Sequence, residues 1–280
     1  MDTQKELFRI GYGPSSSHTM GPQKAAQLFL EKYPQANRFV VDLYGALALT
    51  GRGHLTDFII KRMLGEERTE IRFLGELFYE YHPNGMKFYA YRDEQLLGDW
   101  LVFSVGGGAL KELNENRESH PNHFYRFKTM KDILNYLTTY KRSFLDYVLE
   151  SEPSDILTWA EEVIDVMFAS VEKGLVNHRV LPGPLKIKRR AANFYKQYQK
   201  NNDFNALIFA ATLAVSEENA GGGLIVTAPT CGSSGLVPGV LYSYAIKEKI
   251  PKQNLAQALL VGGSSIRRRW PTSGSGSATP

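Results

Sequence analysis

The 280-residue sequence has little cysteine, and Cys231 is its single thiol. One cysteine cannot form a disulfide within the chain, which favours a reducing compartment. Long apolar runs are missing as well, because ALIFAATLAV (206–215) is far shorter than the ~20 residues that span a bilayer. The N-terminal MDTQKELFRIGYG lacks the apolar core of a signal peptide. We therefore expect a cytoplasmic protein with no membrane partner.

An excess of one charge sign is also lacking. The 33 Lys and Arg residues and 29 Asp and Glu residues leave a formal net charge of +4. So small a charge gives no argument for a nucleic-acid partner. Apolar residues make up 43% of the chain and charged residues 22%, as in ordinary globular proteins of one or two domains.

Alternating apolar residues predict a sheet in the first part of the chain. In FVVDLYG, Phe39, Val41 and Leu43 fall on one face with the two-residue period of a half-buried strand. MKFYAYR (86–92) alternates again after the turn signal HPNG, and a further strand ends at SVGGGA. We expect an α+β N-terminal domain, residues 1–125, with a mostly antiparallel sheet.

Two helices should accompany that sheet. The first begins at Pro22, and the second follows His54 and is expected to turn Phe58, Ile59 and Met63 inward.

From residue 126 onward the pattern is mainly helical. The longest segment places six apolar residues on one stripe before Gly174: Ile156, Trp159, Ala160, Val163, Met167 and Val171. We expect an all-α domain over residues 126–263. The tail, residues 264–280, has no periodicity and ends in Ser, Gly, Thr and Pro, so we expect it to be disordered.

The densest group of reactive side chains lies in GPSSSHTMGP (13–22). This segment opens into a helix, whose first N–H groups favour an anion, and its hydroxyls add donors. His18 can donate to a carboxylate or act as a base. Helix capping accounts for one hydroxyl, but not for four hydroxyls and a histidine. The segment is therefore a candidate anion site.

Other polar motifs have simpler interpretations. His54 in GRGHLTD is best interpreted as a surface histidine beside a helix cap. SVGGGA lacks the GxGxxG pattern, so it favours a turn over a dinucleotide site. KIKRR (186–190) favours a solvated helix face over a phosphate site. Adjacent Glu217 and Glu218 diverge by about 100° on a helix and cannot form a facing acid pair.

The single thiol lies in TAPTCGSSGLVPG (227–239), among small residues that permit close backbone approach. A helix beginning near Ser234 would lower the pKa of a nearby thiol, so we expect Cys231 to be reactive. As a nucleophile Cys231 would need a histidine from elsewhere in the chain. As a metal ligand it would need further ligands, and the sequence has no second cysteine.

Taken together, GPSSSHTMGP, HPNG, SVGGG, LPGPLK and SEENAGGGLIVTAPTCGSSG resemble the iron–sulfur type of bacterial L-serine dehydratase, or L-serine ammonia-lyase. The resemblance runs from about residue 5 to Gly263. It implies a substrate-binding or regulatory α+β domain, a helical catalytic domain and a homodimer. It further implies conversion of L-serine to pyruvate and ammonia, with a [4Fe–4S] cluster on three cysteines as Lewis acid and a protein base taking the α-proton.

The resemblance also assigns roles to residues. His54 and His18 become the catalytic candidates, with His54 as the base. Five hydroxyl residues become candidates for binding L-serine: Ser15, Ser16, Ser17, Thr19 and Thr230. Cys231 is a weak candidate for the metal, because Ser234 stands where the family usually has a ligand cysteine and serine binds cluster iron poorly. The resemblance ends at Gly263, before the remaining ligand cysteines. We therefore expect a truncated chain, as a frameshift would produce, that does not assemble the cluster.

Rival functions stay open at this point. A non-catalytic binder of L-serine or another small carboxylate would use the first domain alone. A hydrolase would use Cys231 as its nucleophile. A pyridoxal-phosphate dehydratase is disfavoured, because no lysine accompanies the glycine-rich loop 221–239 to form the Schiff base.

Overall fold

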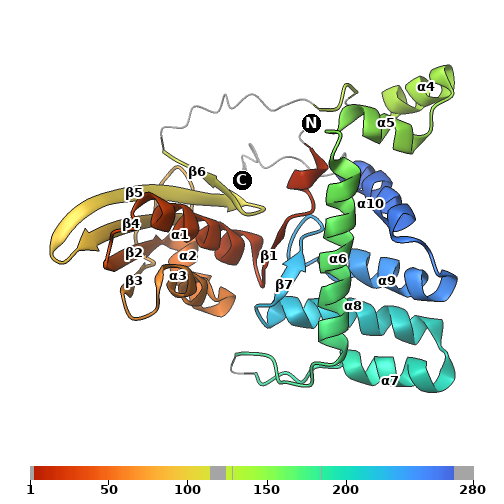
Figure 1. Cartoon of the computed structure of the whole chain (residues 1–280). Coiled ribbons are helices and arrows are strands. Elements are labelled where there is room, and N and C mark those ends of the chain that lie inside the picture. The colour runs from red at the N-terminus through yellow and green to blue at the C-terminus, as the bar shows by residue number, and fades with distance from the viewer. Residues whose placement is uncertain (1–2, 114–123, 128, 184, 268–280) are drawn as a thin grey trace, which may run out of the picture. The chain divides into compact units, whose positions relative to one another are not determined.

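The computed structural model describes residues 3–113, 124–127, 129–183 and 185–267. The chain forms two compact units, which we call the sheet unit and the helical unit (Figure 1). The sheet unit comprises residues 11–117 and 221–223, and the helical unit comprises residues 1–10, 118–220 and 224–280. The short strand β1 (Ile10–Tyr12) lies where the chain first passes from one unit to the other. The expected α+β class with a following helical region is confirmed.

Five strands form the sheet in the order β3-β2-β4-β5-β6. They are β2 (Arg38–Tyr44), β3 (Thr69–Leu74), β4 (Gly85–Arg92), β5 (Gln95–Gly106) and β6 (Ala109–Lys111). β2 and β3 run parallel, and the three other pairs run antiparallel, so the sheet is mostly antiparallel as predicted. The glycines of SVGGGA make the β5–β6 turn with φ angles of 101°, 57° and 76°, which favour glycine.

Helices cover one face of this sheet. They are α1 (Gly21–Lys32), α2 (Gly45–Thr50) and α3 (Thr56–Leu64). The short helix η2 (Ser16–Met20) leads into α1, and η3 (Gly51–His54) follows α2 directly. The predicted strand face is confirmed, because Phe39, Val41 and Leu43 are fully buried against these helices. Phe58 is a correction: it is 57% exposed, since it lies about 100° around α3 from the buried Ile59.

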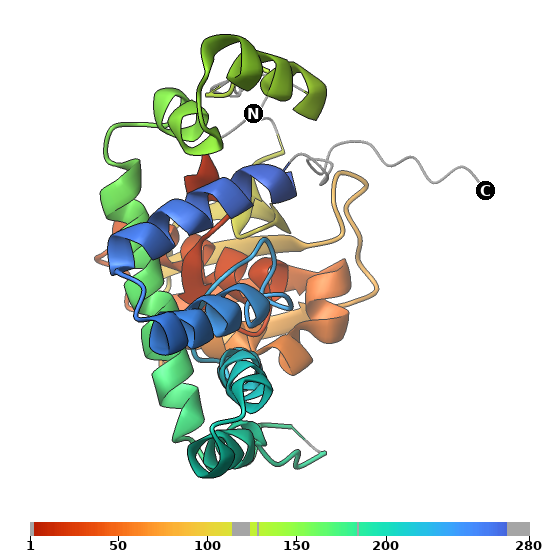
Figure 2. The same ribbon diagram turned by 90° about the vertical axis from the view of Figure 1, so that its right-hand side faces the viewer.

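The helical unit contains most of the remaining elements. They are η1 (Gln4–Glu6), α4 (Met130–Tyr140), α5 (Phe144–Ser151), α6 (Ile156–Leu175), α7 (Ala191–Asn201), α8 (Phe204–Ala220), β7 (Leu224–Val226), α9 (Leu236–Glu248) and α10 (Lys252–Arg267). Figures 1 and 2 both show α6 running the length of this unit beside the other helices. The predicted apolar stripe of α6 is its buried face, and Trp159 packs there while partly buried.

Residues 1–10 join the helical unit through a buried carboxylate. Glu152 accepts hydrogen bonds from the Thr3 hydroxyl, the Gln4 backbone N–H and the Tyr125 hydroxyl, at 2.5, 2.8 and 2.6 Å. The Gln4 side-chain amide donates to the Leu260 carbonyl of α10 at 2.7 Å. Because burying a polar group is costly unless it is hydrogen-bonded, these contacts favour the docked N-terminal segment.

The end of α10 lies within the predicted tail. Residues 264–267 continue the helix to Arg267, and residues 268–280 lie outside the described residues. Of the helices that the structure describes, none has both the length and the apolar character needed to cross a membrane.

Close helix packing makes Gly174 a sensitive position in α6. A Cβ at Gly174 would come within 2.4 Å of the Ala214 carbonyl oxygen and 2.7 Å of the Ala214 Cα on α8. Backbone atoms cannot rotate away, so Gly174→Ala should lower the free energy of unfolding by about 1–3 kcal/mol. The matched control is Gly262→Ala in α10, where a Cβ meets nothing within 4 Å. The control should be neutral or stabilising by up to about 1 kcal/mol. Denaturant titration measures both, and equal midpoints would contradict the packing argument.

Candidate functional site

Two histidines that are distant in the sequence lie together in the sheet unit. The His18 ring in η2 and the His54 ring in η3 have centroids 4.8 Å apart. We call them the histidine pair. The sequence favoured a simple surface role for His54, and the structure instead places it against the predicted anion-binding segment.

The hydroxyls beside the histidine pair differ in their hydrogen-bond partners. Ser15 caps η2 by accepting from the His18 N–H at 3.1 Å, and the Ser17 hydroxyl contacts His18 Nδ1 at 2.8 Å. The Thr19 hydroxyl donates to the His54 carbonyl at 2.7 Å. The Ser16 side chain makes no hydrogen bond to another described residue. Capping thus accounts for Ser15, whereas the Ser16 hydroxyl has no hydrogen-bond partner among the described residues.

A backbone carbonyl fixes the tautomer of His54. His54 Nδ1 lies 3.0 Å from the Thr50 carbonyl oxygen, and a carbonyl can only accept. Nδ1 of the neutral ring must therefore carry the proton, which leaves the lone pair on Nε2. The ring is only partly buried. Nε2 of His54 thus has the form that a general base needs.

The environment of His18 favours its neutral form. Burial lowers the pKa of His18, the proximity of His54 lowers it further, and the Ala46 carbonyl opposes part of the effect. His18 Nε2 is buried without a hydrogen bond of good geometry to any described residue. His18 therefore resists protonation in the folded chain.

Thr56 contributes to this group, although the sequence pattern predicts only a helix cap for it. Its hydroxyl donates to the His18 carbonyl at 2.5 Å. In the sequence it looked like a helix cap, because Thr commonly precedes or opens a helix. The only available signal was a hydroxyl two residues after a candidate histidine, which is weak alone.

A second group of candidate residues lies in the helical unit, in a turn whose hydrogen bonds are mostly internal. It contains Thr230, Cys231 and Ser234. The Thr230 and Ser233 hydroxyls lie 3.0 Å apart, and the Ser233 hydroxyl donates to the Ala228 carbonyl at 2.7 Å. The Ser234 N–H donates to the Cys231 carbonyl at 3.1 Å. The hydroxyl of Ser234 is buried with no partner among the residues described.

The expectation of a reactive Cys231 is wrong. The side chain is only 2% exposed, and this burial raises the pKa of the Cys231 thiol to about 12. Transferring a thiolate out of water outweighs the favourable field of a helix start, so the thiol stays protonated near neutral pH. A hydrolase that uses Cys231 as its nucleophile therefore has no support from this geometry.

The adjacent carboxylates Glu217 and Glu218 at the end of α8 bind different partners, which agrees with the prediction that they do not form a facing acid pair. Glu217 accepts from the N–H of Arg190 at 2.6 Å and so caps α7. Glu218 forms ion pairs with Arg189 and Lys173, each at 2.8 Å. Burial alone would raise the pKa of Glu218, but the bonds from Lys173 and Asn177 and the Arg189 charge hold it below its ordinary value.

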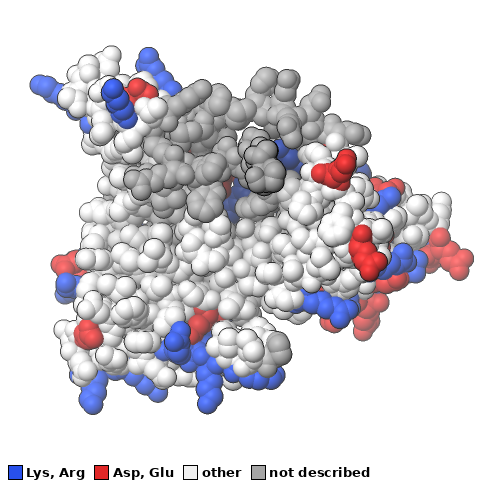
Figure 3. Space-filling view, turned by 180° about the vertical axis from the view of Figure 1, so that it is seen from behind, with Lys and Arg blue, Asp and Glu red and all other residues white. Residues whose placement is uncertain are grey.

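The prediction for KIKRR holds only in part. Residues 186–190 precede α7 and are not helical, and four of the five are exposed. Figure 3 shows Lys and Arg side chains gathered over this part of the helical unit, near α7. Arg189 is the exception: its side chain is 6% exposed because it pairs with Glu218. The pattern of charges could not reveal that partner, which lies on another helix.

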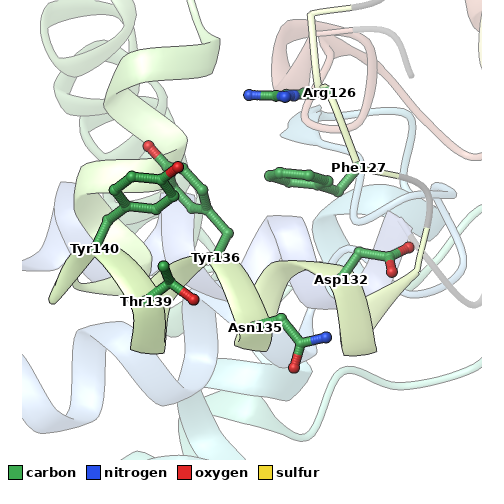
Figure 4. Close-up of a pocket in the computed structure, with 7 residues that line it drawn as sticks. All are labelled: Arg126, Phe127, Asp132, Asn135, Tyr136, Thr139 and Tyr140. Atoms are coloured by element: carbon green, nitrogen blue, oxygen red, sulfur yellow. The ribbon is translucent and has the colours of Figure 1, made fainter.

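A depression of about 430 Å³ lies beside α4 in the helical unit. Figure 4 shows Arg126 and Phe127 on one side and Tyr136 and Tyr140 on the other. Two of its polar groups are already bonded, since the Tyr136 hydroxyl donates to Glu150 at 2.8 Å and Asp132 accepts from Thr129 at 2.6 Å. The histidine pair is therefore the stronger candidate site.

Comparison with known proteins gives two family matches. The chain matches the family described as "Serine dehydratase beta chain" over residues 4–71 and that described as "Serine dehydratase alpha chain" over residues 59–274. The second match continues past Gly263, so the resemblance does not end there.

Individual relatives carry the same name. "L-serine dehydratase 1" of Escherichia coli is 30% identical over 295 residues, covering 85% of this chain and 65% of the relative. "L-serine dehydratase" of Haemophilus influenzae is 31% identical over 298 residues, with the same coverage. "L-serine dehydratase TdcG" of Escherichia coli is 30% identical over 316 residues, covering 92% of this chain and 70% of the relative. The chain thus spans about two thirds of the length of these relatives.

The lowered pKa of His18 predicts an acid-sensitive fold. In the unfolded chain this histidine binds a proton near its ordinary pKa of 6.5, whereas the folded state resists that proton. The contribution to stability is therefore fully present above pH 6.5 and is lost as the pH falls through the lowered value. The stability of the wild-type chain should fall more between pH 7.5 and 5 than that of His18→Gln. Denaturation midpoints across this range measure the difference, and parallel curves would contradict the assignment.

Proposed function

Because the chain belongs to the serine dehydratase family, we propose that it binds L-serine at the histidine pair and that His54 is the base for dehydration of this substrate. The observation that carries the proposal is the 4.8 Å contact between the His18 and His54 rings beside three serine hydroxyls. The relatives named L-serine dehydratase support the choice of substrate.

The carboxylate of L-serine would lie against η2. The Ser16 hydroxyl is uncommitted among the described residues, and the first N–H groups of a helix have no intrahelical acceptor. Charge-assisted bonds from such donors to a carboxylate are stronger than neutral ones. Ser17 would support the site through its contact with His18 Nδ1.

His54 would then take the α-proton of bound L-serine. Its Nδ1–H donates to the Thr50 carbonyl, so Nε2 holds the lone pair that accepts a proton. The lowered pKa of His18 keeps the neighbouring ring neutral, so it does not oppose this protonation.

The [4Fe–4S] cluster that the resemblance implies does not fit the donors of this chain. Such a cluster is held by thiolates, and the sequence contains one cysteine. That thiol is buried with its pKa raised to about 12, and Ser234 is a poor iron ligand. No group of three or more His, Cys, Asp or Glu side chains able to hold a metal occurs in the described part of the chain. The proposed roles of the residues in this chain are therefore substrate binding and proton transfer.

This mismatch favours a second candidate function, binding of L-serine without dehydration. The histidine pair and its hydroxyls all belong to the sheet unit, so binding needs no thiol. A pyruvate assay with L-serine separates the two functions.

Binding of L-serine should depend on the histidine pair. The double variant Ser17→Ala, His18→Ala should weaken L-serine affinity at least about tenfold, because hydrogen bonds to charged groups contribute about 1.5–3 kcal/mol. Isothermal titration calorimetry measures the affinity. The control variant His82→Ala, which changes another histidine of the sheet unit, should bind as the wild type does.

Ethanolamine, which lacks the carboxylate, serves as the control ligand and should not bind. Unchanged L-serine affinity in the double variant would remove the proposed carboxylate site.

The donor argument predicts that this 280-residue chain fails to assemble a stable [4Fe–4S] cluster. The chain should be purified without oxygen, supplied with iron and sulfide, and freed of unbound metal. Visible absorbance and iron content then report the cluster, since one thiolate cannot replace three. About four irons per chain, together with pyruvate formation from L-serine, would overturn this prediction.

A further inference from the structure

The two segments that carry the histidine pair are joined by a crossed pair of hydrogen bonds. The Thr19 hydroxyl, next to His18, donates to the carbonyl of His54 at 2.7 Å. The Thr56 hydroxyl, two residues after His54, donates to the carbonyl of His18 at 2.5 Å. Each histidine residue is thus held through its backbone by a threonine of the opposite segment. We call these two bonds the threonine clasp.

We propose that Thr19 and Thr56 are positioning residues, and that the threonine clasp sets the separation and orientation of the His18 and His54 rings. The importance of this geometry for L-serine rests on the proposed function, but the clasp itself does not. It also gives Thr19 a different role from the substrate contact expected from the family resemblance.

Burial separates positioning from ligand binding. Thr19 is 1% exposed and Thr56 is fully buried. The Thr19 oxygen is also used a second time, as the acceptor of the Ser15 N–H at 3.2 Å. Neither hydroxyl is therefore available to a ligand, and each is committed to the backbone of the site.

The range of these bonds distinguishes them from ordinary threonine contacts. The hydroxyls of Thr50, Thr69 and Thr138 each donate to the carbonyl four residues earlier. Such local bonds cannot connect two segments. The bonds of Thr19 and Thr56 span 35 and 38 residues, so they fix one segment against the other.

The backbone conformation beside Thr56 is consistent with a turn whose geometry is fixed by its hydrogen bonds. Leu55, between His54 and Thr56, has φ 59°, in the left-handed region that a leucine rarely adopts. Strained backbone persists where its surroundings hold it. On one side His54 is bonded to the Thr50 carbonyl, and on the other Thr56 is bonded to His18. This turn directs the Thr56 hydroxyl back to the His18 carbonyl.

The test removes each hydroxyl while keeping the side-chain volume. Thr19→Val and Thr56→Val lose the donor, and Thr19→Ser and Thr56→Ser retain it. The matched control is Thr69→Val, because Thr69 is another buried threonine of the sheet unit whose hydroxyl donates to a carbonyl, that of Gly65, at 2.6 Å. All variants are made in the full chain, and thermal melting confirms that each is folded.

Imidazole NMR provides a readout that does not depend on ligand. The chain has six histidines, and His18→Gln and His54→Gln assign the two signals of the pair. Both valine variants should shift the His18 and His54 signals and weaken their ring-to-ring nuclear Overhauser effect, leaving the His82 signal in place. L-serine affinity should fall at least about tenfold, because loss of one charge-assisted hydrogen bond to the carboxylate weakens binding by about that factor. The serine variants should restore the wild-type spectrum.

Each outcome decides the proposal. Unchanged His18 and His54 signals in the folded valine variants would overturn it, and so would an equal disturbance in Thr69→Val, which would indicate general loosening. If one valine variant does not fold, the other valine variant and the two serine variants decide it by the same criteria. If the spectra change as expected but the wild-type chain binds no L-serine, the clasp stands and the proposed function fails.

Discussion

Buried backbone groups outside regular helices and strands need partners, and in this chain side chains from distant segments supply them. A buried carbonyl or N–H without a partner costs about 1–3 kcal/mol, so such places constrain the fold strongly. Thr56 satisfies the His18 carbonyl, Glu152 satisfies the Gln4 N–H, and Glu217 satisfies the Arg190 N–H. Each of these bonds joins segments that local sequence preference would leave independent. The positions of η2, η3, the N-terminal segment and the loop before α7 all depend on them.

The same constraint explains how far sequence reasoning reached. Periodicity located the buried strand face at Phe39, Val41 and Leu43 and the stripe of α6, because those patterns are local. The prediction that Phe58 points inward was wrong, because the short helix α3 allows more than one apolar stripe and the buried one includes the next residue, Ile59. The sequence pattern alone predicted only a surface role for His54, because nothing near it in sequence indicates that His18, in another segment, lies beside it. Thr56 was missed for the same reason.

Cys231 shows how two correct principles can oppose each other. A helix start favours a thiolate, and burial disfavours it. The sequence displays the first effect through glycines and a following helix, but it does not display burial. In the structure the thiol is only 2% exposed, and the effect of its desolvation exceeds the effect of the helix start. The pKa of Cys231 therefore rises to about 12. The burial of Cys231 could not be predicted from the sequence, and it reverses the conclusion that the thiol is reactive.

The two groups of family-like residues therefore differ in what they require. The histidine pair obtains its tautomer, its cap and its spacing from Thr50, Ser15 and the threonine clasp, all within the sheet unit. The Cys231 turn pairs the Thr230 and Ser233 hydroxyls with each other, leaves the Ser234 hydroxyl without a partner among the described residues, and holds one thiol in a buried site. The proposed recognition of L-serine would thus depend on contacts that this chain contains. Cluster chemistry would need donors that its single cysteine cannot supply. Because the two requirements fall on different residues, the proposed binding of L-serine does not depend on the cluster.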